Sequence, residues 1–301
     1  MSEAALPLPP GRARWRRTAR DFARAPGAVL GAATFLVIVL LAILAPMAVI
    51  HDPYDLSSFS IMDARLAPGE ADFAGTVHPL GTDEQGRDLW SAIVYGLRIS
   101  LIVAAAASAA SFAIGTALGL LAAFRRGWVD ALIMRIVDIQ LAIPSILVAL
   151  VLLAVLGRGV DKTVAALVTV QWVYFARTVR ASAVVEMEKE YVQAARLMGF
   201  SGLRILGRHV LPNCLAPLTV VATVEVAHAI TLEATLSFLG VGLPVTEPSL
   251  GRLVYNGFQF MMNGYWWISA FPALALLILV FSINLVSDRL RDMLNPRRRR
   301  G

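Results

Sequence analysis

Long runs of apolar residues without a charged side chain constrain the fold of this chain more than any other feature of its sequence. The first run, residues 29–50, contains 22 residues and no charge. As an α-helix it would be about 33 Å long, which matches the roughly 30 Å hydrocarbon core of a bilayer. Five further runs cover residues 99–124, 136–156, 163–176, 214–239 and 268–286. We therefore expect an all-α, polytopic membrane protein with six transmembrane helices.

The first run has one alternative interpretation, a cleaved signal peptide. The apolar core of a signal peptide is about 7–15 residues long, whereas this run is longer and follows a 28-residue tail. A membrane anchor is the better interpretation. The chain then divides into a cytoplasmic tail (1–28), a first helix with an extracytoplasmic loop (29–96), a transmembrane core (97–288) with a cytoplasmic loop (177–212), and a basic cytoplasmic tail (289–301).

Composition excludes several other classes of protein. Only 16 % of the residues are charged, against about a quarter in soluble domains. The single cysteine, Cys214, excludes an internal disulfide framework, and four scattered histidines do not predict a metal site. We expect this chain to bind neither a metal nor a cofactor. Its 27 Lys and Arg residues, against 21 Asp and Glu, lie between apolar runs rather than on one face, which favours membrane lipid over nucleic acid as a partner.

Basic residues are distributed unevenly around the apolar runs. They concentrate in the N-terminal tail, the second and fourth loops and the C-terminal tail, while the first loop is rich in acids. Positive residues near a span are retained in the cytoplasm, so both termini are expected on the cytoplasmic side. The four arginines at 297–300 also fit a lipid or nucleic-acid patch, but topology explains them without a ligand.

The extracytoplasmic loop contains a pattern typical of a helix start. Thr82 and Gln85 fit a capping box, with acids at 83 and 84 where a helix N-terminus favours negative charge. We expect a short surface helix there. Residues 89–97 then fit an interfacial segment that leads into the second span.

A stripe of small residues recurs every four positions in the second span, at Ala107, Ser111, Gly115 and Gly119. Small residues at this spacing let two helix backbones approach closely. The sequence does not distinguish packing within the chain from packing on a partner subunit.

The cytoplasmic loop, residues 177–212, has a helical pattern of its own. One apolar face has spacings of 3, 4, 4 and 3 residues, at Val184, Met187, Tyr191, Ala195 and Met198. Gly199 is placed to end this helix, Ser201 to begin a second short helix, and Pro212 to end the second. The loop could lie on the membrane, but such a face is more typical of a surface that docks on another protein.

Four ionisable residues lie within or near the spans, at Asp138, Glu225, His228 and Glu233. Ionisable groups inside a membrane often mark a transport path. Asp138 is expected to be buried beside a partner such as Arg135. The other three have a spacing that allows them to line one path, and hydrogen bonding between helices explains them equally well.

Motifs for enzymatic chemistry are missing from the sequence. It contains no Gly-x-Ser-x-Gly or His-Glu-x-x-His pattern, and neither Lys162 nor Lys189 follows a phosphate-binding loop. We therefore expect no catalytic residues. Energy for transport would come from another subunit or from an ion gradient.

Several motifs resemble those of a known family. Gln193-Ala194-Ala195, then Gly199 and Leu211-Pro212, resemble the cytoplasmic signature of permease subunits of bacterial ABC importers. The dipeptide, oligopeptide and nickel branch, and within it the second permease subunit, is indicated by further motifs at Leu80-Gly81-Thr82-Asp83, Gly86-Arg87-Asp88, Ala142-Ile143-Pro144-Ser145, Leu232-Glu233-Ala234, Leu236-Ser237-Phe238-Leu239-Gly240 and Leu290-Arg291-Asp292.

The resemblance implies a type I ABC importer permease fold, in which the cytoplasmic loop carries a coupling helix seated on an ATPase subunit. The residues it assigns to ATPase coupling are Glu190, Tyr191, Gln193, Ala194, Ala195, Gly199, Phe200, Arg204, His209, Leu211 and Pro212. Gln193 replaces the glutamate of the signature, and His209 replaces an isoleucine of the general pattern. We expect the loss of the acid to weaken a polar contact with the ATPase without removing coupling.

The resemblance also implies a complex in the bacterial inner membrane. Its other members would be a second homologous permease, one or two ATPase subunits that bind ATP and Mg, and an extracytoplasmic substrate-binding protein. The expected substrate is a peptide, with nickel or another small solute as the alternative. A proton-driven secondary transporter using Glu225, His228 and Glu233 stays open, although we find no internal repeat that would support it. A membrane scaffold without transport also stays open.

Overall fold

The computed structural model describes residues 22, 25–49, 53, 60–244 and 247–294. The expectations for most of the N-terminal tail and for the arginines at 297–300 lie outside these residues. Within the described part the chain is almost entirely helical, and its β-structure consists of two isolated bridges, Ala71 with Val77 and Thr82 with Asp88. The expected all-α class is confirmed.

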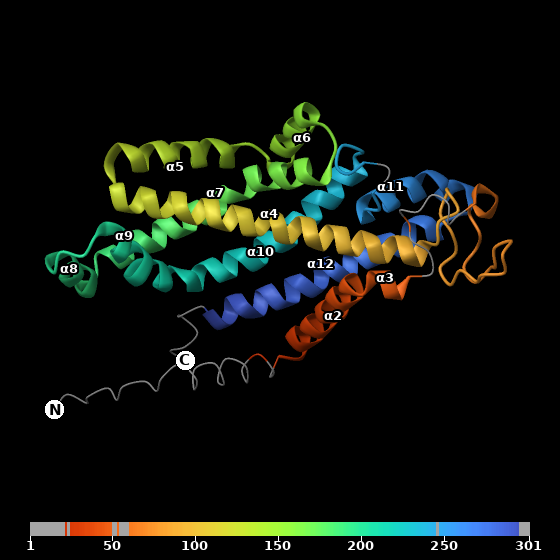
Figure 1. The fold of residues 1–301 in the computed structure, drawn as a ribbon, viewed down its shortest axis with the longest axis horizontal. Coiled ribbons are helices and arrows are strands. Elements are labelled where there is room, and N and C mark those ends of the chain that lie inside the picture. The colour runs from red at the N-terminus through yellow and green to blue at the C-terminus, as the bar shows by residue number, and fades with distance from the viewer. Residues whose placement is uncertain (1–21, 23–24, 50–52, 54–59, 245–246, 295–301) are drawn as a thin grey trace.

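The helices follow one another along the chain, and the longest described stretch without a helix lies between η1 and α4. They are α2 (Pro26–Ile43), α3 (Ala45–Ala48), η1 (Ile61–Asp63), α4 (Leu89–Arg125), α5 (Gly127–Ala142), α6 (Ser145–Leu156), α7 (Val160–Met187), α8 (Glu190–Leu197), α9 (Gly202–Ile205), η2 (Leu206–Val210), α10 (Leu211–Phe238), α11 (Leu250–Phe260), η3 (Met261–Asn263) and α12 (Trp267–Leu294). Helices α4, α7, α10 and α12 run along the long axis (Figure 1). Helices α8 and α9 project at one end, and the 60–88 segment lies at the other.

The expected six spans do not map one to one onto the structure. Among the described residues, four helices are long and apolar enough to cross a membrane: Pro26–Ile43, Leu89–Arg125, Gly202–Phe238 and Trp267–Met293. The bent pair of α5 and α6 would make a fifth. Helix α7 has 28 residues, but Gln171, Arg177 and Arg180 make it more polar. It packs against both α4 and α10, so much of its surface meets protein rather than lipid.

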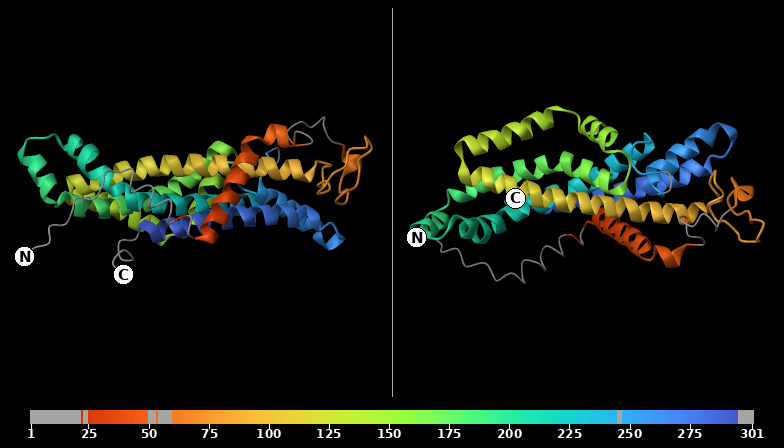
Figure 2. Two further views of the ribbon diagram at one scale, coloured as in Figure 1. Left: turned by 90° about the horizontal axis from the view of Figure 1, so that it is seen from below. Right: turned by 45° about the horizontal axis from the view of Figure 1, so that its top comes forward.

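The third apolar run, residues 136–156, is not the continuous helix that we expected. Helix α5 ends at Ala142, α6 begins at Ser145, and the two are bent by 95°. Ile143 has extended backbone angles, with φ −99° and ψ 133°. A proline disfavours helical angles in the residue before it, so Pro144 causes the break. Figure 2 shows α5 and α6 as an arch that stands off the rest of the bundle.

The expected capping box and surface helix at Thr82 are wrong. The Thr82 hydroxyl donates to the Asp63 carbonyl at 2.6 Å and accepts the Leu66 N–H at 2.8 Å, so it joins distant segments instead. Gly86, at φ +83°, turns the chain away from a helical path. Helix α4 begins only at Leu89, and its N-cap Asp88 accepts the Ser91 N–H at 2.8 Å. The expected interfacial segment at 89–97 is the first part of this one helix.

The stripe of small residues packs α4 onto α7 inside this chain. A Cβ atom on Gly115 would lie 2.4 Å from the Trp172 carbonyl oxygen, and one on Gly119 would lie 2.5 Å from the Ala176 carbonyl oxygen. Both distances are shorter than van der Waals contact. The choice that the sequence left open is therefore settled at these two glycines in favour of packing within the subunit.

We predict that Gly115→Leu prevents the close approach of α4 and α7. Overpacking commonly costs about 1–3 kcal/mol and occasionally more, and the obstacle here is backbone that cannot move aside. The expected result is a large loss of monodisperse protein after detergent extraction, measured by size-exclusion chromatography. Ala117→Leu, which places the same side chain at an exposed position on the same helix, is the control. Equal recovery of the two variants would contradict the packing argument.

Candidate functional site

Helices α8 and α9 form a short hairpin, called here the tip (residues 190–205), at one end of the bundle (Figure 1). Helix α7 stops at Met187, and Lys189 has an extended ψ of 147° before α8 begins at Glu190. The Lys189 ammonium pairs with the Glu186 carboxylate at 2.7 Å across this break. The chain therefore changes direction where the sequence pattern predicts an uninterrupted helix.

The apolar face predicted for the cytoplasmic loop is divided by this break. Met187 is buried on α7 and Ala195 is buried on α8, whereas Tyr191 is 40 % exposed and Met198 is 66 % exposed. Val192, which lies outside the predicted face, is completely buried and packs with Met187 in the same core cluster. The single amphipathic helix was a wrong prediction, because the 3-4-4-3 spacing has meaning only along a continuous helix.

The exposed side of the tip carries a different set of apolar residues. Leu197 is 90 % exposed, Met198 66 % and Leu203 85 %, and they lie on either side of the turn between α8 and α9. Such large apolar side chains at a projecting end form a surface suited to contact with another protein.

Gly199 ends α8 as predicted. It has φ +76°, its N–H donates to the Arg196 carbonyl at 3.0 Å, and the Phe200 N–H donates to the Ala195 carbonyl at 3.2 Å. These two bonds form a Schellman cap, which requires a left-handed residue. Ser201 occupies the N-cap position of α9, as expected, although its side chain makes no capping bond.

Pro212 does not end the second short helix. Helix α9 continues through the π-helical turn η2 into α10, and Pro212 lies in the first turn of α10. The π-helical turn directly before it already departs from the regular α-helical hydrogen-bond pattern, which allows a residue without an N–H at this position.

Four residues, one each from α7, α8, η2 and α10, meet beside the tip in what we call the joint: Glu186, Tyr191, His209 and Asn213. The Tyr191 hydroxyl donates to the Glu186 carboxylate. The Asn213 amide donates to the Tyr191 hydroxyl at 3.1 Å and to the His209 carbonyl at 2.7 Å. Burial, followed by the contact with Glu186, raises the pKa of Tyr191 to about 12, so its hydroxyl stays protonated. The joint thus connects α8 to the ends of both α7 and α10.

Aromatic contacts extend the joint into the tip. The His209 ring stacks on the Tyr191 ring, with 6.3 Å between the ring centroids. It also contacts the Phe200 ring, whose centroid lies 6.1 Å away. The Arg204 guanidinium lies 5.5 Å from the Phe200 ring. The histidine that departs from the general family pattern is therefore part of the packing between α8, α9 and α10.

Gln193 makes a contact that the signature glutamate would not. Its side-chain Nε2 donates to the Met187 carbonyl at 3.2 Å, at the C-terminal end of α7. An ionised carboxylate accepts hydrogen bonds and cannot donate one, so a glutamate would not make this bond.

The remaining residues assigned to coupling lie nearby: Glu190 and Ala194 are exposed on α8, and Leu211 and Pro212 begin α10.

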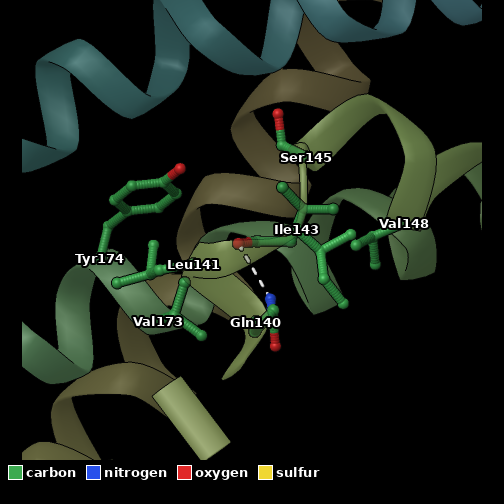
Figure 3. Close-up of a pocket in the computed structure, with 8 residues that line it drawn as sticks. Gln140, Leu141, Ile143, Ser145, Val148, Val173 and Tyr174 are labelled. Atoms are coloured by element: carbon green, nitrogen blue, oxygen red, sulfur yellow. Dashed lines mark hydrogen bonds between the residues drawn. The ribbon is translucent and has the colours of Figure 1, made fainter. Parts of the chain in front are cut away.

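A second group of polar residues lies halfway along the bundle. The Glu225 carboxylate lies 3.5 Å from the His228 Nδ1 atom on α10, and the Tyr174 ring of α7 lies 6.3 Å from the His228 ring. We call these three residues the mid-bundle cluster. Tyr174 also lines a small hollow at the α5/α6 bend, together with Gln140 and Ser145 (Figure 3).

The other two ionisable residues lie elsewhere. Glu233 is completely buried and accepts hydrogen bonds from Ser100 at 2.8 Å, Ser237 at 2.8 Å and Ser249 at 3.0 Å. Asp138 is exposed and faces Arg177 at 4.0 Å, so its expected burial beside Arg135 is wrong. The structure brings Glu225 and His228 together and keeps Glu233 and Asp138 apart from them. Whether any of them lines a path stays a prediction.

The sequence patterns did not indicate several residues of these two sites. Asn213 and Glu186 carry no motif, although they flank the predicted turns. Gln171, whose amide donates to the Glu225 carbonyl at 2.7 Å, and Gln140, which accepts the Trp172 indole N–H at 3.2 Å, are amides within apolar runs. An amide in such a run is the signal that could have indicated them.

Among the described residues, no three His, Cys, Asp or Glu side chains are grouped so that they could hold a metal ion.

A helical bundle with membrane-length helices, a broken helix and a projecting hairpin defines a polytopic membrane transport subunit. The comparisons with known proteins identify its family. The chain belongs to the family of binding-protein-dependent transport system inner membrane components, the permease subunits of ABC importers, which matches residues 115–300. Residues 13–68 match the N-terminal transmembrane domain of oligopeptide transport permease C. This is a family of transport permeases rather than enzymes, and its members act with ATPase and binding-protein partners.

Curated relatives cover almost the whole chain. A putative peptide transport system permease protein of Brucella suis is 42 % identical over 93 % of this chain and 91 % of its own length. The di/tripeptide transport system permease protein DppC of Pseudomonas aeruginosa is 39 % identical over 92 % and 90 %. The dipeptide transport system permease protein DppC of Escherichia coli is 38 % identical over 98 % and 95 %.

A solved structure supports the fold. An inward-facing form of the MetNI methionine ABC transporter aligns with a TM-score of 0.56 at 22 % identity, over 68 % of this chain and 97 % of that one. This likeness confirms the type I importer permease fold and carries no information about the substrate.

We predict that Gln193→Glu loosens the break between α7 and α8. The carboxylate would lose the bond to the Met187 carbonyl and place a negative charge at the negative end of the α7 dipole, at a cost of about 1 kcal/mol. That cost corresponds to about fivefold faster hydrogen exchange of the α8 amides, measured by mass spectrometry. Gln193→Met, which removes the donor without adding charge, separates the two contributions. Unchanged exchange in both variants would show that the Gln193 bond does not stabilise the tip.

Proposed function

We propose that this chain imports peptides as one of two permeases in an ATP-driven complex, with the tip as its contact to an ATPase subunit. The observation that carries the proposal is the tip itself. It exposes Leu197, Met198 and Leu203 at the end of the bundle, while the joint connects it to α7 and α10. Movement of an ATPase would therefore reach two long helices through one set of contacts.

Peptide is the proposed substrate class because of the relatives. Three of them, at 38–42 % identity over more than nine-tenths of this chain, are named as peptide, di/tripeptide and dipeptide permeases. The other proposed members of the complex are a second homologous permease, one or two ATPase subunits that bind ATP and Mg, and an extracytoplasmic binding protein. This chain would hold no cofactor, and both of its termini would be cytoplasmic.

The proton-driven alternative has weaker support. It needs Glu225, His228 and Glu233 on one path, and the Glu233 carboxylate is enclosed by three serines on the far side of α10 from His228. Helical positions five residues apart point in widely different directions, which separates His228 from Glu233. A scaffold without transport would leave the unsatisfied oxygen of Glu225 without a purpose.

We predict that Gly199→Arg abolishes recovery of the ATPase subunit with this chain. A side chain at φ +76° costs about 1–2 kcal/mol, and here it distorts the turn that presents Leu197 and Leu203. The test is affinity co-purification of the tagged chain from membranes that express its native gene neighbours, with ATPase activity assayed in the eluate.

Gly127→Arg is the matched control for this experiment. Gly127 also has a positive φ, of 57°, and an added Cβ would meet no atom within 4 Å, but it is the first residue of α5 and not part of the tip. The control is expected to retain the ATPase. If a stable wild-type chain recovers no ATPase, or if both variants recover it equally, the proposed role of the tip is wrong.

We predict that Tyr191→Phe lowers the number of peptides imported per ATP hydrolysed. Loss of the hydroxyl weakens the joint by about 1–2 kcal/mol but leaves the exposed apolar surface of the tip in place. The complex should therefore assemble and hydrolyse ATP, with movement of the tip reaching α10 less completely. Uptake and ATP hydrolysis are measured together in proteoliposomes. Tyr265→Phe, at the opposite end of the bundle, is the control, and an unchanged ratio in Tyr191→Phe would exclude the joint from transmission.

A further inference from the structure

We infer that Glu225, His228 and Tyr174, the mid-bundle cluster, form this subunit's half of a binding site for the N-terminal ammonium of a transported peptide. The inference rests on the proposed import of peptides. It adds the chemical group that the transport path recognises and the residues that recognise it.

The first observation is an unpaired oxygen on Glu225. The residue is only 5 % exposed, and its Oε2 atom has no hydrogen-bond partner among the described residues. Its neighbour is the His228 Nδ1 atom, at 3.5 Å. A buried carboxylate oxygen without a donor is costly, and a charged one more so. A donor supplied by a ligand would remove that cost.

The position of Glu225 along the bundle fits a transport path. It lies 14 residues after Leu211 and 13 residues before Phe238, the two ends of α10. At roughly 1.5 Å per residue it is about 20 Å from either end. Substrate sites in secondary transporters commonly lie at this depth beside a broken helix, and this bundle has such a break at Ile143 and Pro144, where α5 and α6 are bent by 95°.

The cluster also opens toward the outside of the isolated chain. The His228 side chain is 34 % exposed, Val224 is 44 % exposed, and Thr231 is exposed on the same face of α10. Polar side chains at mid-membrane depth face protein or water rather than lipid. A water-filled path shared with the second permease satisfies this requirement.

The hollow at the bend lies beside the cluster and is lined by polar as well as apolar groups. Figure 3 shows Tyr174 on α7 at one edge of the hollow and Ser145, the first residue of α6, across from it. Gln140 is held in place, because its amide nitrogen donates to the Thr169 and Val170 carbonyls. Tyr174 therefore connects the hollow to the ring of His228, 6.3 Å away.

The chemistry of these groups favours an ammonium over other ligands. An ammonium has three donors and no acceptor, and the cluster offers a carboxylate, an imidazole nitrogen and a phenol oxygen. A carboxylate ligand would be repelled by Glu225. Nickel is not favoured, because no three His, Cys, Asp or Glu side chains group together in the described part of the chain.

The other acids of the spans do not offer the same opportunity. Glu233 already accepts three serine hydrogen bonds, and Asp138 faces a cation of its own, Arg177. Glu225 thus differs from both in having acceptor capacity left for a ligand.

The test measures peptide binding to the complete complex in nanodiscs without its binding protein, by equilibrium dialysis. The probes are radiolabelled Ala-Ala, which carries the N-terminal ammonium, and N-acetyl-Ala-Ala, which has a neutral amide in its place. The wild type should bind Ala-Ala at least about tenfold more tightly, as expected for a charge-assisted pair. Glu225→Gln should lose this preference, Glu225→Asp should retain part of it, and the control Asp138→Asn should retain it fully.

Two outcomes would overturn the inference: a wild type without the preference, or Glu225→Gln with the preference intact. If Glu225→Gln keeps the preference and its uptake loses a dependence on a proton gradient, the cluster is a proton relay instead. ATP-driven uptake of Ala-Ala by the wild type with its binding protein is measured in parallel. Failure of that uptake contradicts the peptide-import proposal itself, whereas normal uptake without an ammonium preference contradicts only the site.

Discussion

Every backbone N–H and C=O inside a bilayer must find a partner within the protein, and this requirement governs the rest of the structure. It permits α-helices, and it makes each interruption of a helix at membrane depth costly. The long helices meet it with hydrogen bonds within each helix, and α4 and α7 then pack closely at Gly115 and Gly119. The break at Ile143 and Pro144 is informative for the same reason, because the chain accepts its cost beside a polar hollow.

The same reasoning separates two glutamates on one helix. Glu233 is buried at the meeting point of α4, α10 and the start of α11, and three serine hydroxyls fill its acceptor sites. Those bonds fix the relative positions of the three elements, which is a structural use of a buried acid. Glu225 has an oxygen without such a donor and lies next to a half-buried histidine. The residue type is the same, and it is the contacts that distinguish a packing role from a binding role.

The sequence predicts what depends on local pattern and misses what depends on distant contacts. Apolar runs place α2, α4, α10 and α12, and the glycine at 199 places the end of α8, because these features are set by nearby residues. The break after Met187 has no proline or glycine to mark it. It is stabilised by Tyr191 reaching Glu186 and Asn213, contacts that no spacing encodes. Two of the serines around Glu233 come from positions 100 and 249, which no local pattern relates to it, whereas Ser237 lies one helical turn away on α10.

The two candidate sites are parts of one mechanical arrangement. Asn213 in the joint and Glu225 in the mid-bundle cluster lie on the same helix, 12 residues or about 18 Å apart, and Glu186 and Tyr174 lie 12 residues apart on α7. The π-helical turn η2 precedes α10 directly, so the tip continues into that helix without a flexible linker. A helix transmits displacement along its axis because its hydrogen bonds resist extension. A movement of the tip that tilts α7 against α10 would therefore change the separation of Tyr174 from His228, the contact on which the affinity of the cluster depends. Import requires a site that binds differently in two conformations, and this geometry relates that difference to the surface proposed to meet the ATPase.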